Sequence, residues 1–530
     1  MANKDQFIQD ITQGYTFKGE SIRLGGAMLD GEVQTGTIVR IPLKTLNRHG
    51  LIAGSTGSGK TKTLQIIAEQ LSKHGVPSLL MDIKGDLSGV AVPSSGHPKI
   101  DERHAAIGFE FEANGSPVEF LTLSDEPGAR LRATVTEFGP VLFSKILDLN
   151  DTQSGIVAVI FKYCDDKKIP LIDLKDFKKT LQYLTGEGKE EVEADYGRIS
   201  SASTGAILRR IVELEQQGAE AFFGEVSFEI EDLMRTDRQG RGIINILRVT
   251  DIQDRPKLFS TFMLQMLAEI YATLPEEGDS GKPKLVLFID EAHLVFEEAS
   301  KTLLSQIEAI VKLIRSKGVG IFFVTQNPAD IPNDVLGQLG LKIQHSLRAF
   351  TAKDRKAIKL AAENYPLTDY YEVKDLLTDL GIGEALVSAL SEKGKPTPLV
   401  HTMLRAPESR MDVLTKKEID NIIDNSVLVE RYNKEVDRES AYEILSAKIE
   451  EAQKAEHQEK LKKEQEKAAK STSRSRRSTK AEKSMFEKAT SNTAVRQIGR
   501  TVARELTRGL LGALGIRSTT RRSRKKSSWF

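Results

Sequence analysis

The chain contains a single cysteine, Cys164, among its 530 residues. One cysteine excludes disulfides within the chain and zinc sites built from several cysteines. The first residues, MANKDQFIQDITQG, lack the basic start and apolar run of a signal peptide. No apolar run approaches the roughly 18 residues that a membrane-spanning helix needs. We therefore expect a cytoplasmic protein with no transmembrane segment.

Several catalytic signatures are missing as well. The sequence has no N-K-x-D motif for guanine recognition and no L-S-G-G-Q-like signature of transporter ATPases. It also lacks an H-E-x-x-H motif, a serine elbow and the catalytic loop of kinases. These absences argue against a GTPase, a transporter-type ATPase, a zinc peptidase, an α/β-hydrolase and a protein kinase.

The net charge of +1 hides an asymmetry along the chain. Residues 451–530 carry 22 Lys and Arg against 8 Asp and Glu, a net charge of +14. The totals of 76 and 75 leave 54 basic and 67 acidic side chains in residues 1–450, a net charge of −13. An acidic body with a basic tail predicts that the tail contacts an anionic partner. The candidates are nucleic acid, an anionic membrane surface and the body itself.

The residues Gly54–Thr61, GSTGSGKT, match the pattern G-x-x-x-x-G-K-T at every fixed position. An apolar run precedes this loop and apolar residues at helical spacing follow it, so it lies between a predicted strand and a predicted helix. Glycines let backbone N–H groups turn inward around a phosphate, and the helix N-terminus adds its dipole. The alternative is a glycine-rich turn that binds nothing. The predicted ATP contacts are Gly54, Ser55, Thr56, Gly57, Ser58, Gly59, Lys60, Thr61 and Lys62.

Within this loop, Lys60 would reach the β- and γ-phosphates, and Thr61 would ligate Mg²⁺. A second motif, PKLVLFIDE at Pro283–Glu291, is an apolar run that ends in two acids. A buried parallel strand has this composition and ends at the edge of the sheet where ligands bind. Asp290 would complete the Mg²⁺ shell, and Glu291 would polarise the attacking water as general base.

Other polar residues follow predicted strands or precede them. Gln326 follows the strand-like run Gly320–Thr325 and would contact the γ-phosphate or orient the water, or would only end the strand. Arg315, in the predicted helix Ala309–Lys317, suits a charge-stabilising arginine finger, or is a solvated helix residue. Arg348 is a second arginine candidate. In the motif DIKGD, Asp82 and Asp86 would lie near Mg²⁺ or water, or would only form a turn. Lys84 would approach nucleic acid or a phosphate.

Lys60 and Asp290 lie 230 positions apart, which is long for one parallel-sheet core. We interpret the helical block between them, with Asp151 as a candidate N-cap, as an insertion. Alternating strands and helices predict an α/β fold, and Glu384–Leu390 with Pro396–Leu404 predict a hairpin. The predicted segments are a β-rich lead-in (1–45), the first half of the ATPase core (46–138), a helical insertion (139–235), the second half of the core (236–406), a helical extension (407–470), a disordered basic linker (471–485) and a basic amphipathic helix with its tail (486–530).

The last of these segments has a regular pattern. Arginines recur every four residues from Arg496 to Arg508, and apolar residues recur every four from Ile498 to Leu514. The two series are offset by two positions, which places them on opposite faces of a helix. Such a helix could dock on the protein or a neighbouring subunit, contact nucleic acid, or lie on a membrane surface.

Four motifs occur in order: NRHGLIAGSTGSGKT (Asn47–Thr61), MDIKGDLSG (Met81–Gly89), LVLFIDEAHLVF (Leu285–Phe296) and GVGIFFVTQNPADIP (Gly318–Pro332). Together they resemble the HerA-like ATPases of the HerA/FtsK group, and most closely a bacterial branch of uncharacterised HerA-like helicases. The resemblance covers most of residues 10–405. It implies a RecA-like P-loop NTPase core of the ASCE type with a mainly parallel sheet.

The resemblance also implies roles. Members of the group typically assemble as hexameric rings with nucleotide at subunit interfaces, so a neighbour would supply an arginine, and characterised relatives move DNA through the ring. The residues that match the group's functional positions are Lys60, Thr61, Asp290, Glu291, Gln326 and, with a variable spacing, Arg315.

Two hypotheses of function remain open at this point. The first is a motor that couples ATP hydrolysis to translocation on DNA. The second is an ATP-driven switch or protein-remodelling ATPase that does not act on nucleic acid, and the acidic body favours it because a DNA channel needs local positive charge.

Overall fold

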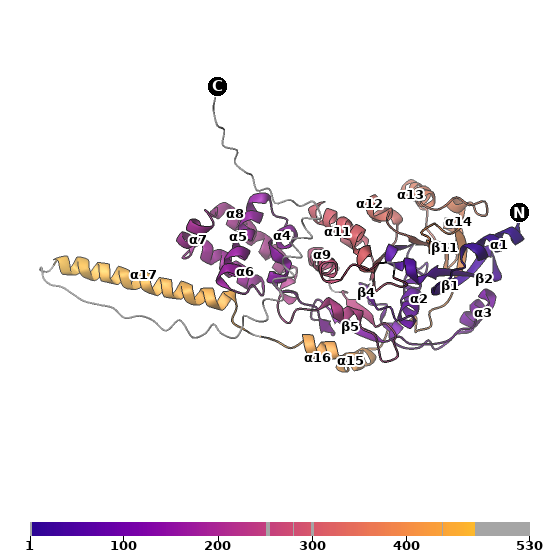
Figure 1. Cartoon of the computed structure of the whole chain (residues 1–530), viewed down its shortest axis with the longest axis horizontal. Helices are drawn as coiled ribbons and strands as arrows, with labels where there is room; N and C mark the ends of the chain where they lie inside the picture. Colours follow the sequence, from indigo (N-terminus) through magenta and orange to yellow (C-terminus); the bar gives the residue numbers. More distant parts are fainter. Residues whose placement is uncertain (1–2, 251–254, 279, 298–300, 437, 472–530) are drawn as a thin grey trace, which may run out of the picture. The chain divides into compact units, whose positions relative to one another are not determined.

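The computed structural model describes residues 3–250, 255–278, 280–297, 301–436 and 438–471. By its internal contacts the chain divides into two units, Met1–Lys448 and Ile449–Phe530. The first unit holds the sheet and its surrounding helices (Figure 1). In the second unit, the described residues belong to the far part of helix α17 (Ala441–Ser471).

One mixed sheet forms the centre of the first unit. Its order is β2-β1-β12-β11-β10-β3-β9-β8-β4-β7-β5-β6, and the run from β10 to β6 is parallel. This confirms the predicted α/β fold with a mainly parallel sheet. The strands are β1 (Ser21–Leu29), β2 (Glu32–Pro42), β3 (Gly50–Ala53), β4 (Ser78–Asp82), β5 (Val118–Thr122), β6 (Ala129–Arg130), β7 (Ile244–Arg248), β8 (Leu285–Ile289), β9 (Val319–Thr325), β10 (Leu341–Gln344), β11 (Glu384–Ser388) and β12 (Val400–Leu404).

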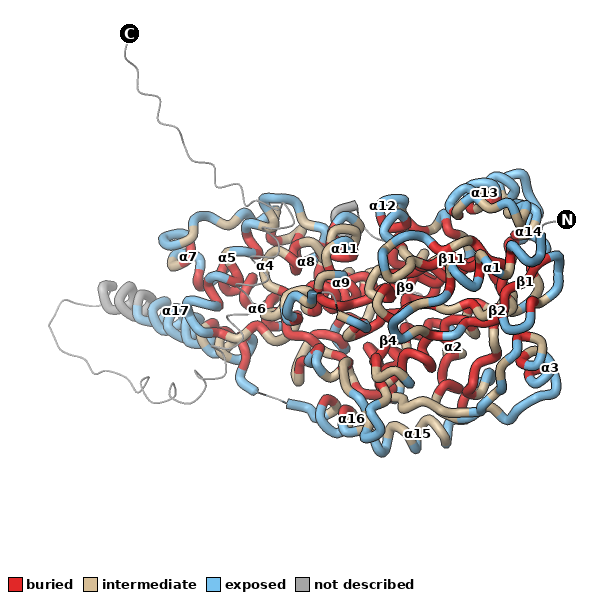
Figure 2. Tube along the Cα trace, turned by 45° about the vertical axis from the view of Figure 1, so that its right-hand side comes forward, coloured by how far each residue is buried: buried red, intermediate tan, exposed pale blue. Residues whose placement is uncertain are grey.

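The strands that carry the motifs are fully buried. Every residue of β3, β8 and β9 is buried, and their side chains are mainly Val, Ile, Leu and Phe. Such continuous apolar strands need cover on both faces. Figure 2 shows the buried residues along β4, β9 and β11, while exposed residues lie on peripheral helices such as α3 and α13.

Strand β9 lies between β3 and β8, and all three are parallel. The strand before the glycine loop and the strand that ends in Asp290 are therefore not adjacent. Strand β9 separates these two strands. Parallel strands end at the same edge of a sheet. The residues that follow Ala53, Ile289 and Thr325 therefore lie at the carboxyl edge.

Helices connect and cover the strands. Most follow the predicted pattern of apolar residues at helical spacing. Their bounds are α1 (Lys4–Gly14), α2 (Lys60–Lys73), α3 (Pro98–Ile107), α4 (Val135–Ile146), α5 (Asp151–Lys167), α6 (Leu174–Thr185), α7 (Lys189–Asp195), α8 (Ser201–Gln216), α9 (Pro256–Thr273), α10 (His293–Glu297), α11 (Lys301–Ile314), α12 (Asn333–Leu336), α13 (Ala352–Glu363), α14 (Val373–Asp379), α15 (Lys416–Asp424), α16 (Val427–Tyr432) and α17, with a 3₁₀ turn, η5 (Arg315–Lys317), after α11.

The predicted helical block between the two halves of the sheet is present as α4–α8, between β6 and β7. The N-cap of α5 differs from the prediction. Asn150, not Asp151, caps it: the Asn150 side chain accepts from the Gln153 N–H, and the Gln153 side chain accepts from the Asn150 N–H. Asn150 has extended backbone angles, whereas Asp151 is already helical, so only Asn150 can act as the cap.

The start of the chain holds a helix that was not predicted. Helix α1 precedes the two long strands β1 and β2 of the β-rich lead-in. Its buried residues Phe7 and Ile11, followed by Tyr15, recur every four residues, which is the helical signal in this stretch. The predicted hairpin is confirmed, since β11 and β12 pair antiparallel with Ala385 opposite Thr402.

Beyond the sheet, helix α15 begins with a capping box formed by Thr415 and Glu418. Helix α17 forms the end of the predicted helical extension, and its side chains from residue 451 to residue 462 are exposed. Apart from Ser471, the predicted linker 471–485 and the basic helix 486–530 lie outside the described residues. None of the described helices is both long and apolar enough to span a membrane. The boundaries of the seven predicted segments stay predictions.

Candidate nucleotide site

The glycine loop (Gly54–Gly59) joins β3 to α2 at the carboxyl edge of the sheet. Gly57 and Gly59 have φ values of 80° and 113°, a region that favours glycine. At Gly54 an added Cβ would lie 2.5 Å from the Cβ of His345, so a side chain has no room there. No side chain caps the N-terminus of α2, as far as the structure describes it. The N–H groups of its first turn are therefore available to an anion.

Lys60 is buried at the start of α2, with an exposed fraction of 5%. Its Nζ donates to the carbonyl oxygens of Gly54 at 2.7 Å and Ser55 at 3.2 Å. Burial lowers the pKa of Lys60, as does the charge of Lys84, while Glu291 and Asp290 raise it. The ammonium group thus lies inside the loop and within the field of both acids.

Asp290 follows β8 and is almost completely buried. Its Oδ1 accepts from the Glu291 N–H at 2.9 Å, but its Oδ2 has no hydrogen-bond partner among the described residues. Burial raises the pKa of Asp290 to about 6, against the opposing effect of Lys84. An orphaned carboxylate oxygen in this position fits a hard cation such as Mg²⁺, which prefers oxygen ligands.

Glu291 is buried beside Asp290 and has a φ of 45°, unusual for a residue other than glycine. The ammonium group of Lys84 forms an ion pair with its Oε1, and Nδ1 of His293 lies 3.3 Å from its Oε2. Burial alone would raise the pKa of Glu291, but Lys84, His293 and Lys60 together hold it below its usual value. The side chain is therefore held as an anion.

Gln326 follows β9 and is exposed next to the glycine loop. The hydroxyl of Thr56 donates to its Oε1 at 3.4 Å. The pairing of Ala53 with Thr325 brings the ends of β3 and β9 to the same level, which explains this contact. The structure thus brings together the loop, Asp290, Glu291 and Gln326.

Arg315 does not belong to this group. It lies in η5, directly before β9, and hence at the amino edge of the sheet, opposite the glycine loop. There it lines a pocket of about 410 Å³ with Lys44, Arg48 and Lys312 among its neighbours. The predicted helix Ala309–Lys317 has a wrong C-terminal bound, because α11 ends at Ile314 and a 3₁₀ turn follows, which ends at Gly318 with a φ of 75°. Arg348, in contrast, is exposed at the carboxyl edge after β10.

Lys62 has a different environment from that of Lys60. Its Nζ donates to the Met411 carbonyl at 2.5 Å and to Oε1 of Gln65 at 3.3 Å. The side chain therefore binds the segment after β12, and the contact between Lys62 and ATP stays a prediction.

Two further residues support the site. Asp82, at the end of β4, accepts from the N–H groups of Gly85, Asp86 and Leu87, and burial raises its pKa to about 7. Asp82 thus forms the turn that presents Lys84 to Glu291. His345 lies under the loop, where its Nε2 is 2.9 Å from the Thr63 hydroxyl. No sequence motif marks His345, so its role could not be predicted.

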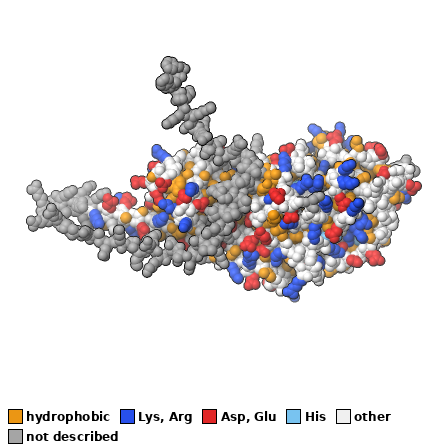
Figure 3. Space-filling model, viewed as in Figure 1, with side chains coloured by type: hydrophobic (Ala, Val, Ile, Leu, Met, Phe, Trp, Pro, Cys, Tyr) orange, Lys and Arg blue, Asp and Glu red, His pale blue; other side chains and the backbone are white. Residues whose placement is uncertain are grey.

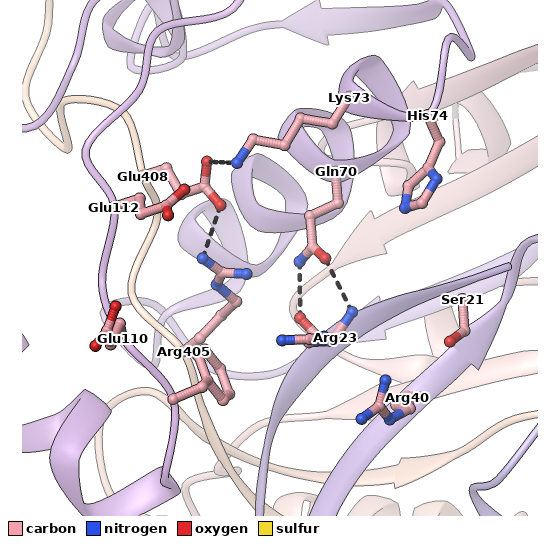
Figure 4. A pocket seen from close by; sticks show the side chains of 11 residues that line it. Ser21, Arg23, Arg40, Gln70, Lys73, His74, Glu110, Glu112, Arg405 and Glu408 are labelled. Atoms are coloured by element: carbon pink, nitrogen blue, oxygen red, sulfur yellow. Dashed lines mark hydrogen bonds and ion pairs between the residues drawn. The ribbon is translucent and has the colours of Figure 1, made fainter.

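At its other end, helix α2 lines a pocket of about 530 Å³ (Figure 4). Glu408 binds both Lys73 and Arg405 there, and Gln70 exchanges two hydrogen bonds with the backbone of Arg23. These contacts fix the end of α2 against β1 and against the segment that follows β12. This pocket holds none of the residues of the glycine loop.

The fold and the site define a P-loop ATPase in which a strand lies between the phosphate-loop strand and the strand that ends in Asp290-Glu291. The family model described as Helicase HerA-like C-terminal matches residues 28–519, and the chain belongs to this family. This confirms the resemblance to HerA-like P-loop ATPases.

Curated relatives are distant in sequence. The chain is 22% identical over 372 residues to the DNA double-strand break repair helicase HerA of Sulfolobus acidocaldarius. The match covers 67% of this chain and 66% of that protein, so the chain spans about two thirds of this relative. It is 25% identical to a probable helicase of Methanocaldococcus jannaschii, with coverage of 72% and 70%. Among solved structures, the bacterial conjugative coupling protein TrwBdeltaN70 is similar, with 14% identity, a TM-score of 0.49 and coverage of 77% and 95%.

Proposed function

We propose that this protein is a cytoplasmic motor that hydrolyses ATP with Mg²⁺ to move along DNA as a ring of identical subunits. The observation that supports it most is the convergence of Lys60, Asp290 and Glu291 at one edge of the sheet in a member of the HerA-like family. The relatives named as helicases support the choice of DNA as the substrate.

The residues of this chain would share the work as follows. The loop N–H groups and the Lys60 ammonium would bind the phosphates. Thr61 and the free Oδ2 of Asp290 would hold Mg²⁺, which supplies positive charge against the phosphate oxygens. Glu291, held as an anion, would accept a proton from the attacking water. Gln326, beside Thr56, would orient that water.

The position of Arg315 supports assembly into a ring. Within one chain it lies at the edge of the sheet opposite the glycine loop. In a head-to-tail ring the amino edge of one subunit could face the carboxyl edge of the next. Arg315 would then contact the neighbour's nucleotide, and six subunits are the number that the family resemblance implies.

The test is ATP hydrolysis by the full chain without nucleic acid, with single-stranded DNA and with duplex DNA, at moderate salt. Lys60→Ala and Glu291→Gln serve as controls. Stimulation by one form of DNA, absent in both variants, supports a DNA motor. If hydrolysis depends on Lys60 and Glu291 but its rate does not change with DNA, the protein is an ATPase and the DNA part of the proposal is wrong.

The second candidate is an ATP-driven switch or protein-remodelling ATPase. The net charge of −13 on residues 1–450 favours it, because an acidic body repels DNA unless positive charge is gathered locally. DNA-independent hydrolysis that a protein partner stimulates would support this candidate.

A further inference from the structure

A group of exposed cations lies at the carboxyl edge of the sheet, on the segment that follows β10. Five cations and one carboxylate occur within residues 346–360. Phe350 stands among them with 81% of its surface exposed. In Figure 3, Lys and Arg side chains project from the upper right of the body, where Figure 1 places α13. We call this surface the basic edge, and its members are Arg348, Phe350, Lys353, Arg355, Lys356 and Lys359.

The basic edge is firmly anchored although its side chains are exposed. Ile358 and Ala361 of α13 belong to a buried cluster that also contains Leu347, Leu377 and Leu386. This cluster fixes one face of the helix, so the cations project from the other faces. The backbone of α13 is therefore held against the body by this cluster.

The single carboxylate among these residues does not neutralise the cations. Asp354 accepts from the N–H groups of Phe350 and Thr351 as part of the capping box that begins α13. The side chains of the five cations form no hydrogen bond or ion pair with another described residue, although the charge of Lys353 helps to lower the pKa of Asp354. Because like charges three and four positions apart on a helix repel one another, an anionic partner would relieve this repulsion.

The same segment is tied to the phosphate loop. The N–H of His345 donates to the Ala53 carbonyl at 2.7 Å. Ser55 of the loop donates to the Ser346 carbonyl twice, through its N–H at 2.8 Å and its hydroxyl at 3.0 Å. Arg348 follows two residues later. A nucleotide that moves Ser55 would therefore move the backbone that leads to the basic edge.

We propose that the basic edge binds single-stranded DNA, with the phosphates on its lysines and arginines and a base stacked on Phe350. An exposed aromatic ring among unpaired cations is the combination that single strands recognise. This site rests on the proposed function as a DNA motor, and it supplies the local positive charge that an acidic body needs in order to bind DNA. The hydrogen bonds of Ser55 to Ser346 couple the strand to the state of the nucleotide.

The test compares three variants of the full chain, so that the basic tail is the same in all. One replaces three lysines of the basic edge, Lys353→Gln/Lys356→Gln/Lys359→Gln. A matched control replaces three exposed lysines elsewhere, Lys99→Gln/Lys416→Gln/Lys417→Gln. The third is Phe350→Ala. Binding to a fluorescent oligothymidine is measured by anisotropy over a salt series. Binding to a duplex of equal length and to phosphatidylserine vesicles is measured separately for each variant. Tm and ATP hydrolysis without DNA check the fold.

We expect the triple variant at the basic edge to bind the single strand at least about tenfold more weakly, with a salt slope shallower by about 2, since each lost phosphate contact on a single strand contributes about 0.7. Phe350→Ala should lower the affinity for the single strand by about tenfold and leave the salt slope unchanged. The control should stay within about twofold of the wild type, and all variants should keep their DNA-free hydrolysis.

Two results would overturn the proposal in different ways. If the wild type binds DNA and the triple variant behaves like its control, or loses only duplex or vesicle binding, the basic edge is not the site and the DNA motor stands. If the wild type neither binds DNA nor responds to it, the proposed function fails and this site fails with it.

Discussion

Lys84 and Glu291 form an ion pair at the carboxyl edge of the sheet, between the turn after β4 and the end of β8. The turn is held by Asp82, whose carboxylate accepts from three backbone N–H groups. The glutamate that would activate water is thus positioned by a lysine from another strand. Hydrolysis in this protein should therefore depend on a residue outside the phosphate-loop and Asp-Glu motifs.

Lys84→Met tests this dependence, because methionine keeps most of the side-chain length and removes the charge. The buried Glu291 would lose its main counter-ion, so we expect kcat for ATP to fall by about tenfold or more. Stability should fall by only about 1 kcal/mol, since Lys84 is partly exposed. Lys99→Met, at an exposed site, is the matched control. An unchanged kcat in Lys84→Met would contradict a positioning role.

Two glycines of the loop should differ in their tolerance of alanine. Gly54→Ala would place a Cβ 2.5 Å from that of His345, whereas nothing lies within 4 Å of a Cβ at Gly57. In Gly57→Ala only the positive φ should lower the stability, by about 1–2 kcal/mol. We expect Gly54→Ala to be the less stable variant and to lose affinity for a fluorescent ATP analogue more strongly. Equal effects of the two substitutions would show that contact with His345 does not determine whether the loop tolerates a side chain at position 54.

The stability of the protein should depend on Glu269 at alkaline pH. Burial raises the pKa of Glu269 from 4.5 to about 8, and the charges of Glu137 and Glu231 add to the shift. A carboxyl group with a raised pKa stays protonated in the folded state while the unfolded state releases its proton, so stability falls as pH rises from about 4.5 to about 8. Glu269→Gln removes this loss.

We therefore expect wild type and Glu269→Gln to have similar urea midpoints at pH 4.5, and the variant to be more stable at pH 8.5 by an amount on the order of a few kcal/mol. The comparison needs only urea unfolding followed by circular dichroism at the two pH values. If the stabilities of the wild type and Glu269→Gln differ by the same amount at pH 4.5 and pH 8.5, titration of Glu269 is not the cause.

Arg315 should act between subunits. Arg315→Ala should lower kcat by about 10³-fold, the usual cost of removing an arginine finger. Because its partner site would belong to another copy, mixing Arg315→Ala with Lys60→Ala should restore part of the hydrolysis that each variant lacks alone. Lys312→Ala, in the same pocket, is the control and should keep its activity. If the mixed assemblies recover no ATP hydrolysis, Arg315 acts within its own chain or has no role in hydrolysis.

The local motifs were predictable, and the contacts between distant segments were not. Gly54–Thr61 and Asp290-Glu291 follow from short-range constraints: glycine angles, a helix start, and an apolar strand that ends in acids. Parallel pairing then places them at one edge. The pair of Lys84 with Glu291, the support by His345 and the turn of Lys62 toward Met411 depend on segments that are far apart in sequence. The burial that makes these contacts strong is set by the tertiary fold.

The basic edge illustrates the same limit. The residues of α13 are a charged helix in the sequence, and nothing local shows that β10 delivers them to the edge that holds the nucleotide. Only the pairing of β10 with β3 and the hydrogen bonds of Ser55 to Ser346 reveal the connection.

Movement of the protein along DNA can be measured directly, as ATP-dependent displacement of a triplex-forming oligonucleotide from a linear duplex. A DNA motor should displace the oligonucleotide with ATP, whereas Lys60→Ala and Glu291→Gln should not. ATP hydrolysis by the wild type without any displacement, on duplexes with either blunt or single-stranded ends, would contradict a DNA motor.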